Sequence, residues 1–168
     1  MPQPEGLGSL FNIALAIAPL DLQTARTGLR VNVKHCSRVG ILIIKGVGTD
    51  GDDQTFTLVE YTASTGGSSA NAAIIDHYYE QEEISLDGDE SWVKVTQTPA
   101  ATVAPGDPSA QSQAMYYIPI DTDKMSDGYA WLGLDSDGAG SAAQLGCAIF
   151  LLEYPTYPGA PANLPQAL

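Results

Sequence analysis

Apolar residues in this chain recur with the two-residue period of β-strands, and no segment shows sustained helical periodicity. Residues 29–34 alternate apolar and polar side chains, and residues 39–47 form a β-branched run flanked by Gly40 and Gly46. A turn cluster at residues 49–53 separates this run from a second alternating segment at residues 55–61, which predicts a hairpin. Only residues 20–27 are compatible with a short helical turn.

Further strand-like segments complete an all-β fold. The full set of expected strands lies at residues 12–17, 29–34, 39–47, 55–61, 73–79, 92–98, 115–120, 128–134 and 145–154. Their spacing predicts an antiparallel β-sandwich or a Greek-key, jelly-roll-like fold of about eight strands. Pro119 indicates an edge strand or a strand end. The links between the strands are a polar loop at 62–71, an acidic link at 80–90, a long loop at 98–113 and a glycine-rich hairpin loop at 135–141.

The length of 168 residues predicts one domain with extended arms. Residues 1–20 form an N-terminal arm and first strand, residues 21–154 the sandwich, and residues 155–168 a proline-rich C-terminal arm. Prolines hold such an arm extended and remove backbone donors, so we expect it to contact a partner; a frayed terminus is the alternative. The residues expected to contact a partner through the two arms are Leu10, Phe11, Ile13, Tyr154, Pro155, Tyr157, Pro158, Pro161 and Leu164.

The charge balance argues against anionic partners. Seven Lys and Arg residues against twenty Asp and Glu residues give a formal net charge of −13, which opposes binding to nucleic acid or to anionic membranes. The apolar run at residues 10–20 is too short to cross a bilayer. The nine residues before it contain Glu5 and no Lys or Arg, unlike a signal peptide. We therefore expect a soluble protein.

No motif for catalysis or for a cofactor emerges. Cys36 and Cys147 form no disulfide framework and have no metal-ligand spacing, so we expect reduced, buried thiols. His35 and Cys36 are adjacent on an expected strand, where their side chains point to opposite faces and cannot pair readily. His77 is more typical of a surface or an interface. We predict a protein that is not an enzyme and has no cofactor.

The acidic clusters are predicted to build turns and not to bind metal. Residues 135–138 faintly resemble the start of a calcium loop, but Ala139 and Gly146 stand at the fifth and twelfth positions, where that motif needs oxygen ligands. Asp and Gly residues at such places are typical of β-turns.

The order of strand and turn types resembles a family of small virion proteins of tailed bacteriophages. The segments that carry the resemblance are residues 31–34, 39–45, 46–53, 55–59, 127–132, 151–157 and 163–165. Proteins of that family are typically encoded beside the major capsid protein. The resemblance implies a capsid decoration, or cement, protein. Residues 74–113 carry no part of it.

This reading makes the chain a structural virion protein that binds the major capsid protein on the outside of a phage head and stabilises it. It is expected to be made in the bacterial host cytoplasm and to self-associate, with a homotrimer as the expected oligomer. The alternative is a glycan-binding or receptor-binding module of a tail or head spike, with Trp92 or Trp131 as the sugar platform. Ordinary packing of these aromatic rings is the competing explanation.

Overall fold

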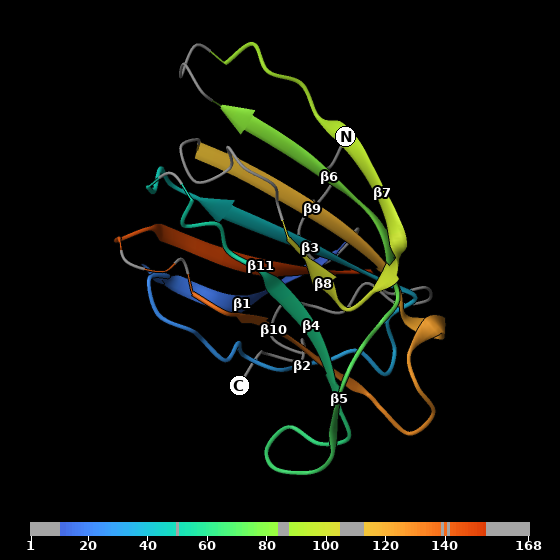
Figure 1. Cartoon of the computed structure of the whole chain (residues 1–168). Coiled ribbons are helices and arrows are strands. Elements are labelled where there is room, and N and C mark those ends of the chain that lie inside the picture. The colour runs from blue at the N-terminus through green and yellow to red at the C-terminus, as the bar shows by residue number, and fades with distance from the viewer. Residues whose placement is uncertain are drawn as a thin grey trace, which may run out of the picture.

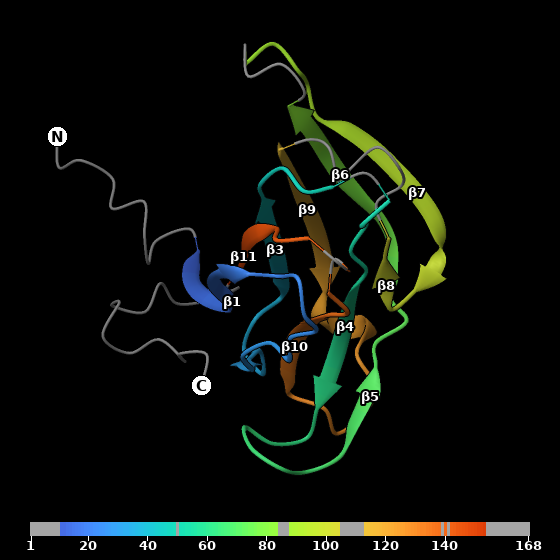
Figure 2. The same cartoon turned by 60° about the vertical axis from the view of Figure 1, so that its left-hand side comes forward.

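The structure is a computed structural model, and it describes residues 11–49, 51–83, 88–104, 113–138, 140 and 142–153. Two antiparallel β-sheets lie face to face (Figures 1 and 2). The first sheet has, in spatial order, strands β1 (Asn12–Asp21), β11 (Leu145–Glu153), β3 (Arg38–Lys45), β9 (Gln113–Asp121), β6 (Ile75–Glu83) and β7 (Val93–Ala100). The second contains β2 (Val31–Asn32), β10 (Trp131–Ser136), β4 (Phe56–Tyr61) and β5 (Ser69–Asn71), with β8 (Thr102–Val103) also paired to β4. A short 3-10 helix, η2 (Thr122–Lys124), follows β9.

Strands from the start of the chain pair with strands from its end in a nested order. β1 pairs with β11, β2 with β10, β3 with β9, and β4 with β5. These eight strands form two four-stranded layers, which is the arrangement of a jelly roll. The predicted fold class, an all-β antiparallel sandwich, is confirmed.

The β6–β7 hairpin widens the first sheet beyond this eight-stranded core. β6 pairs with the outer edge of β9, and β7 pairs with β6. The hairpin lies within residues 74–113, the part of the sequence that carries no family resemblance. The addition therefore extends one layer of the sandwich and leaves the nested core pairing unchanged.

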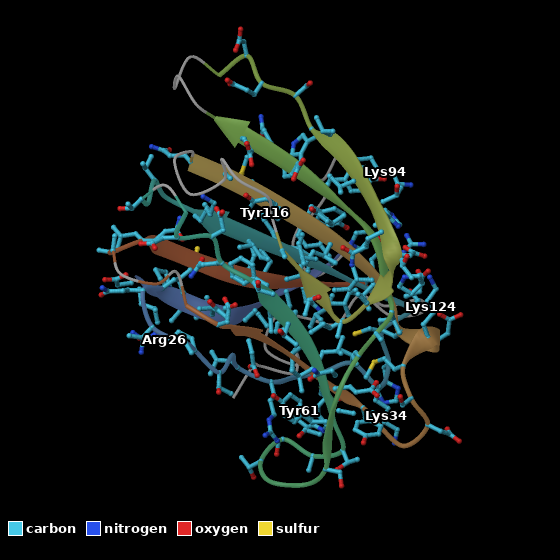
Figure 3. The ribbon with its side chains drawn as sticks, viewed as in Figure 1. Arg26, Lys34, Tyr61, Lys94, Tyr116 and Lys124 are labelled. Atoms are coloured by element: carbon cyan, nitrogen blue, oxygen red, sulfur yellow. The ribbon has the colours of Figure 1, made fainter. Side chains whose placement is uncertain are left out.

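The core lies between the two inner sheet faces, where inward-facing residues of β1, β3, β9 and β11 in one sheet and of β4 and β10 in the other are buried. Its largest side chains include Tyr116 on β9 and Phe150 on β11, together with Phe56 on β4 (Figure 3 labels Tyr116). Tyr78 packs against Tyr116 edge-on, with 6.5 Å between the ring centroids. Burial of these rings supplies much of the apolar area that stabilises the sandwich.

Two expected hairpins are wrong. β3 and β4 follow one another in sequence but belong to different sheets, and so do β10 and β11. The turn clusters at residues 49–53 and 135–141 therefore carry the chain from one layer to the other. A turn sequence signals a change of direction, but it does not determine whether the next strand pairs with the previous one.

Several strand bounds also differ from those expected. β2 ends at Asn32, and Lys34 and His35 lie in a turn. Residues 20 and 21 belong to β1, with no helical turn after them. β5 and β8 are short strands within segments expected to be loops, and β6 extends to Glu83 into the expected acidic link. These polar segments are strands because they pair with neighbouring strands, and local composition does not predict such pairing.

Pro119 lies in an internal strand, which the sequence did not predict. β9 pairs with β3 along its length, and Pro119 stands opposite Gly40. The β6 ladder, however, ends at Tyr117. Pro119 therefore lies beyond the last residue paired on that side, where the missing N–H breaks no bond of that ladder.

The core position of Phe150 gives a stability prediction. Phe150→Ala should lower the free energy of unfolding by about 3–5 kcal/mol, because it leaves a cavity between the two sheets. Leu145→Ala on the same strand, where the side chain is 68% exposed, should cost less than about 0.5 kcal/mol. Urea denaturation followed by far-UV circular dichroism measures both values. Equal costs for the two variants would contradict the burial pattern of β11.

Candidate functional site: the outer face of the six-stranded sheet

The six-stranded sheet carries apolar side chains on the face that points away from the second sheet. On β1, Ile13 and Leu15 are 45% and 44% exposed, while the alternating residues Ala14 and Ala16 are buried. The same alternation continues on β11, β3 and β9. We call this surface the outer apolar face; its residues are Ile13, Leu15, Leu42, Ile44, Tyr79, Met115, Tyr117, Pro119, Cys147, Ile149 and Leu151.

Cross-strand pairing joins these side chains into rows. Leu15 on β1 stands opposite Ile149 on β11, and Ile149 stands opposite Leu42 on β3. The row continues from Leu42 to Tyr117 on β9 and then to Tyr79 on β6. Five strands therefore contribute to one continuous apolar row. An exposed apolar surface that runs across a sheet in this way is typical of an interaction site.

An aromatic groove lies at the β6 end of this row. Its volume is about 380 Å³, and it is lined by Leu42, Tyr79, Trp92, Tyr117 and Leu151. The rings of Tyr79 and Tyr117 lie 6.3 Å apart between centroids, with an angle of 38° between their planes. Trp92, directly before β7, is 44% exposed. The groove thus presents large apolar rings to whatever occupies it.

Gly40 allows the Tyr117 ring to lie across β3. A Cβ atom placed on Gly40 would stand 2.6 Å from Tyr117 Cε2 and 2.8 Å from its hydroxyl oxygen. Both distances are shorter than a van der Waals contact, so a larger residue at position 40 would displace the ring. The shape of the aromatic groove therefore depends on a glycine on the neighbouring strand.

Charged groups border the face at the end where β11 finishes. Arg38 Nε lies 3.4 Å from Asp121 Oδ1, and Arg38 Nη1 lies 3.5 Å from Glu153 Oε2. Burial raises the pKa of the Tyr117 hydroxyl; Glu153 raises it further and Arg38 opposes the shift. Tyr117 therefore stays neutral at physiological pH, as an apolar groove requires.

Lys45 is a buried cation at the opposite end of β3, with 4% of its surface exposed. Burial lowers its pKa to about 8, although Glu82 and Asp53 favour the charged form. A lysine that loses its proton this readily makes the stability of the sandwich depend on pH.

The acidic residues near the loops mostly bind backbone amides. Asp135 Oδ1 accepts a hydrogen bond from the Gly28 N–H at 2.9 Å, and Asp137 Oδ1 accepts one from the Thr55 N–H at 2.7 Å. Asp52 Oδ2 accepts one from the Ala142 N–H at 3.0 Å. Within the described residues, no three His, Cys, Asp or Glu side chains gather as a metal site. These bonds agree with the turn role expected for residues 135–138.

The structure places only part of the expected contact set. Phe11 is half-buried directly before β1, and Ile13 belongs to the outer apolar face. Leu10 and the C-terminal residues Tyr154, Pro155, Tyr157, Pro158, Pro161 and Leu164 lie outside the described residues.

The two tryptophans do not share a platform. Trp92 lines the aromatic groove on the first sheet, whereas Trp131 is a half-buried residue of β10 in the second sheet, opposite Tyr61 and Asn32. Trp92 therefore borders the aromatic groove, and Trp131 does not.

Cys36 and Cys147 are both reduced. Cys36 is buried, and the adjacent His35 is exposed. Cys147 is half-buried on the outer apolar face, so the expectation of two buried thiols is wrong for this residue; burial nonetheless raises its pKa. His77 Nδ1 lies 2.5 Å from Asp76 Oδ1, and Lys124 contacts the same carboxylate.

Sequence reasoning missed most of the outer apolar face, including Leu42, Ile149 and Leu151. The available signal was that β3, β9 and β11 are apolar at both alternating sets of positions. Such runs predict strands buried on both faces. Here the second face has no layer over it among the described residues.

Comparisons with known proteins do not establish a family. No protein-family model matches the sequence, and no curated protein matches it. The crystal structure of the SPBc2 prophage-derived protein YomS aligns over 85% of this chain and 96% of that chain, with a TM-score of 0.42 and 8% identity. The structure of infectious bursal disease virus Gt strain aligns over 92% of this chain and 44% of that chain, with a TM-score of 0.28 and 9% identity. The structure of the Gx strain of that virus aligns over 86% of this chain and 40% of that chain, with a TM-score of 0.26 and 9% identity. The chain spans less than half of these two viral chains, and similarity at this level shows neither a shared family nor a shared function.

No helix in the described part of the chain is long and apolar enough to cross a bilayer.

Lys45 gives a prediction for the pH dependence of stability. Burial holds the pKa of Lys45 at about 8, whereas an ordinary lysine has a pKa of about 10.5. Between these values the unfolded state binds more protons at this site, so the Lys45 contribution to stability rises with pH. That contribution should grow by about 2 kcal/mol between pH 8 and about pH 9.5. Unfolded cysteines lose their protons in the same range, so the contribution is the difference between the wild type and Lys45→Met at each pH. Urea denaturation across this range measures it.

Lys45→Met should remove this rise, and Lys94→Met, at an exposed position on β7 (Figure 3), should leave it in place. If the wild type and Lys45→Met show the same pH dependence, the ammonium group keeps its normal pKa.

Proposed function

We propose that the chain is a structural, non-enzymatic virion protein that attaches to the outside of a bacteriophage head as a decoration protein. The observation that carries the proposal is the outer apolar face, which spans five strands and has no layer over it among the described residues. The family resemblance of the sequence supports the same assignment. The major capsid protein and further copies of this chain are the partners proposed for it.

The chemistry of the surface suits attachment. Each exposed Ile or Leu that becomes fully buried contributes on the order of 1 kcal/mol, because about half of its side chain is still in water. A net charge of −13 keeps the free subunits apart and soluble until the face is covered. Such a protein binds by burying area and needs no reactive group.

β1 is the part of the face that we assign to the head. Among the described strands β11 is its only ladder partner. The Ala16 carbonyl oxygen accepts a hydrogen bond from the Leu29 N–H at 2.7 Å, which occupies the later half of this edge. In the earlier half Ile13 and Leu15 are exposed, whereas Asn12 and Ala14 are buried. In this proposal the head contacts the earlier half and buries the side chains of Ile13 and Leu15.

The first test adds the purified chain to undecorated, expanded heads. Binding should saturate at a fixed number of copies and should raise the temperature at which the heads break, because a ligand of the intact lattice stabilises it by mass action. Sedimentation of heads with bound protein gives the stoichiometry, and a thermal scan gives the rupture temperature. Heads that neither bind the chain nor gain heat resistance would overturn the proposal.

Surface variants locate the contact. Ile13→Glu combined with Leu15→Glu should weaken head binding at least about tenfold, because two apolar contacts are replaced by charges. The matched control is Val47→Glu, which adds a charge at a site that is 54% exposed outside the sheet. Equal loss in both would indicate a general charge effect and not a contact through β1.

The aromatic groove favours glycan binding as a second candidate function, because flat rings stack on sugar rings. If this function holds, Trp92→Ala should abolish binding on a glycan array while head occupancy is unchanged, and Trp131→Ala should leave glycan binding intact. Absence of glycan binding by the wild-type chain would eliminate this candidate.

A further inference from the structure

The aromatic groove lies close to the last described residue of the chain, and the residues that follow it in sequence are similar to the groove in chemistry. Leu151 lines the groove, and Glu153, two residues later, is the last described residue. The remaining segment, residues 154–168, contains four prolines, two tyrosines and two leucines, and it carries no charged side chain. An uncharged segment of this kind matches a groove formed by Leu42, Tyr79, Trp92, Tyr117 and Leu151.

Proline-rich segments bind aromatic grooves for a physical reason. Proline holds the backbone near the polyproline II conformation, so the segment loses little conformational entropy when it is bound. Its rings and the intervening apolar side chains pack between aromatic rings, which is a recurrent mode of peptide recognition. Pro155, Pro158 and Pro161 recur every three residues, the period of a polyproline II helix.

The reach and direction of the segment favour the groove of another subunit. Fifteen residues in this conformation span about 46 Å. The face measures about 19 Å from β1 to β6, which is four strand spacings, so the segment is longer than the face is wide. An extended chain that continues along β11 leads away from the face of its own subunit. The segment must reverse direction to reach its own groove, but it needs no reversal to reach a neighbour.

We propose that residues 154–168 of one subunit lie in the aromatic groove of a neighbouring copy, so that exchanged C-terminal arms join the subunits. Tyr154, Tyr157 and Leu164 are the apolar anchors of this contact. The exchange concerns contacts between copies of the chain and stands apart from the attachment of β1 to heads. Each can therefore fail without the other.

Trp92 supplies a local reporter for the test. In a Trp131→Phe background, Trp92 is the remaining tryptophan, and acrylamide quenching of its fluorescence measures whether the groove is covered. At concentrations where the chain associates, quenching of Trp92 should be several-fold weaker than in a variant that ends at Glu153. Dilution of the full chain should raise quenching to that of the shortened variant, in parallel with dissociation seen by sedimentation velocity.

Two matched variants keep the test independent of whether the shortened chain folds. Leu164→Asp removes an anchor and should expose Trp92 and produce monomers, whereas Asn163→Asp adds the same charge next to it and should retain most of the association. A synthetic peptide of residues 154–168, added to the variant that ends at Glu153, should protect Trp92 in a saturable manner.

Three results would overturn the proposal. Equal quenching of Trp92 in the full and shortened chains would show that the segment does not cover the groove. Protection that persists in diluted monomers would place the segment on its own subunit. Loss of head binding on removal of residues 154–168, with quenching and oligomeric state unchanged, would assign the segment to the head, a result distinct from failure of head binding by the full chain.

Discussion

β11 holds the two ends of the described chain together by pairing with β1 on one side and with β3 on the other. Its inward residues Ala148, Phe150 and Leu152 belong to the core, and its outward residues Ile149 and Leu151 join the outer apolar face. The last strand of the sequence thus contributes to both the interior and the surface. In the sequence, each further pair lies between the two strands of the pair before it: β2 and β10 lie between β1 and β11, and β3 and β9 lie between β2 and β10.

Strands with two apolar faces give the sandwich its interaction surface. β3, β9 and β11 lie in the middle of the wider sheet, where one face packs on the second sheet and the other remains partly open. The β6–β7 hairpin extends this open face and adds Tyr79 and, at its β7 end, Trp92. A region that lies outside the nested core therefore contributes two of the aromatic groove's three rings.

The sequence predicts the class of fold well because alternation is a local property. The alternating segments at residues 55–61 and 145–154 correspond to β4 and β11 with small shifts. Partner choice is not local: Val39 and Phe56 begin apolar runs separated by a turn, yet their strands lie in different sheets. The same limit applies to the candidate site. Leu42, Tyr79 and Tyr117 are far apart in sequence, and only the pairing of β3, β9 and β6 brings them into one row.

The antiparallel pairing of Asn12 with Leu152 places the first and last described strands in direct register. Facing residues in such a pair stand about 5 Å apart, a gap that a short peptide linker can bridge. The jelly roll is therefore suited to circular permutation: a chain joined across this pair and opened in the exposed β4–β5 loop retains every ladder of both sheets. The chain enters β1 and leaves β11 at the same pole of the sandwich.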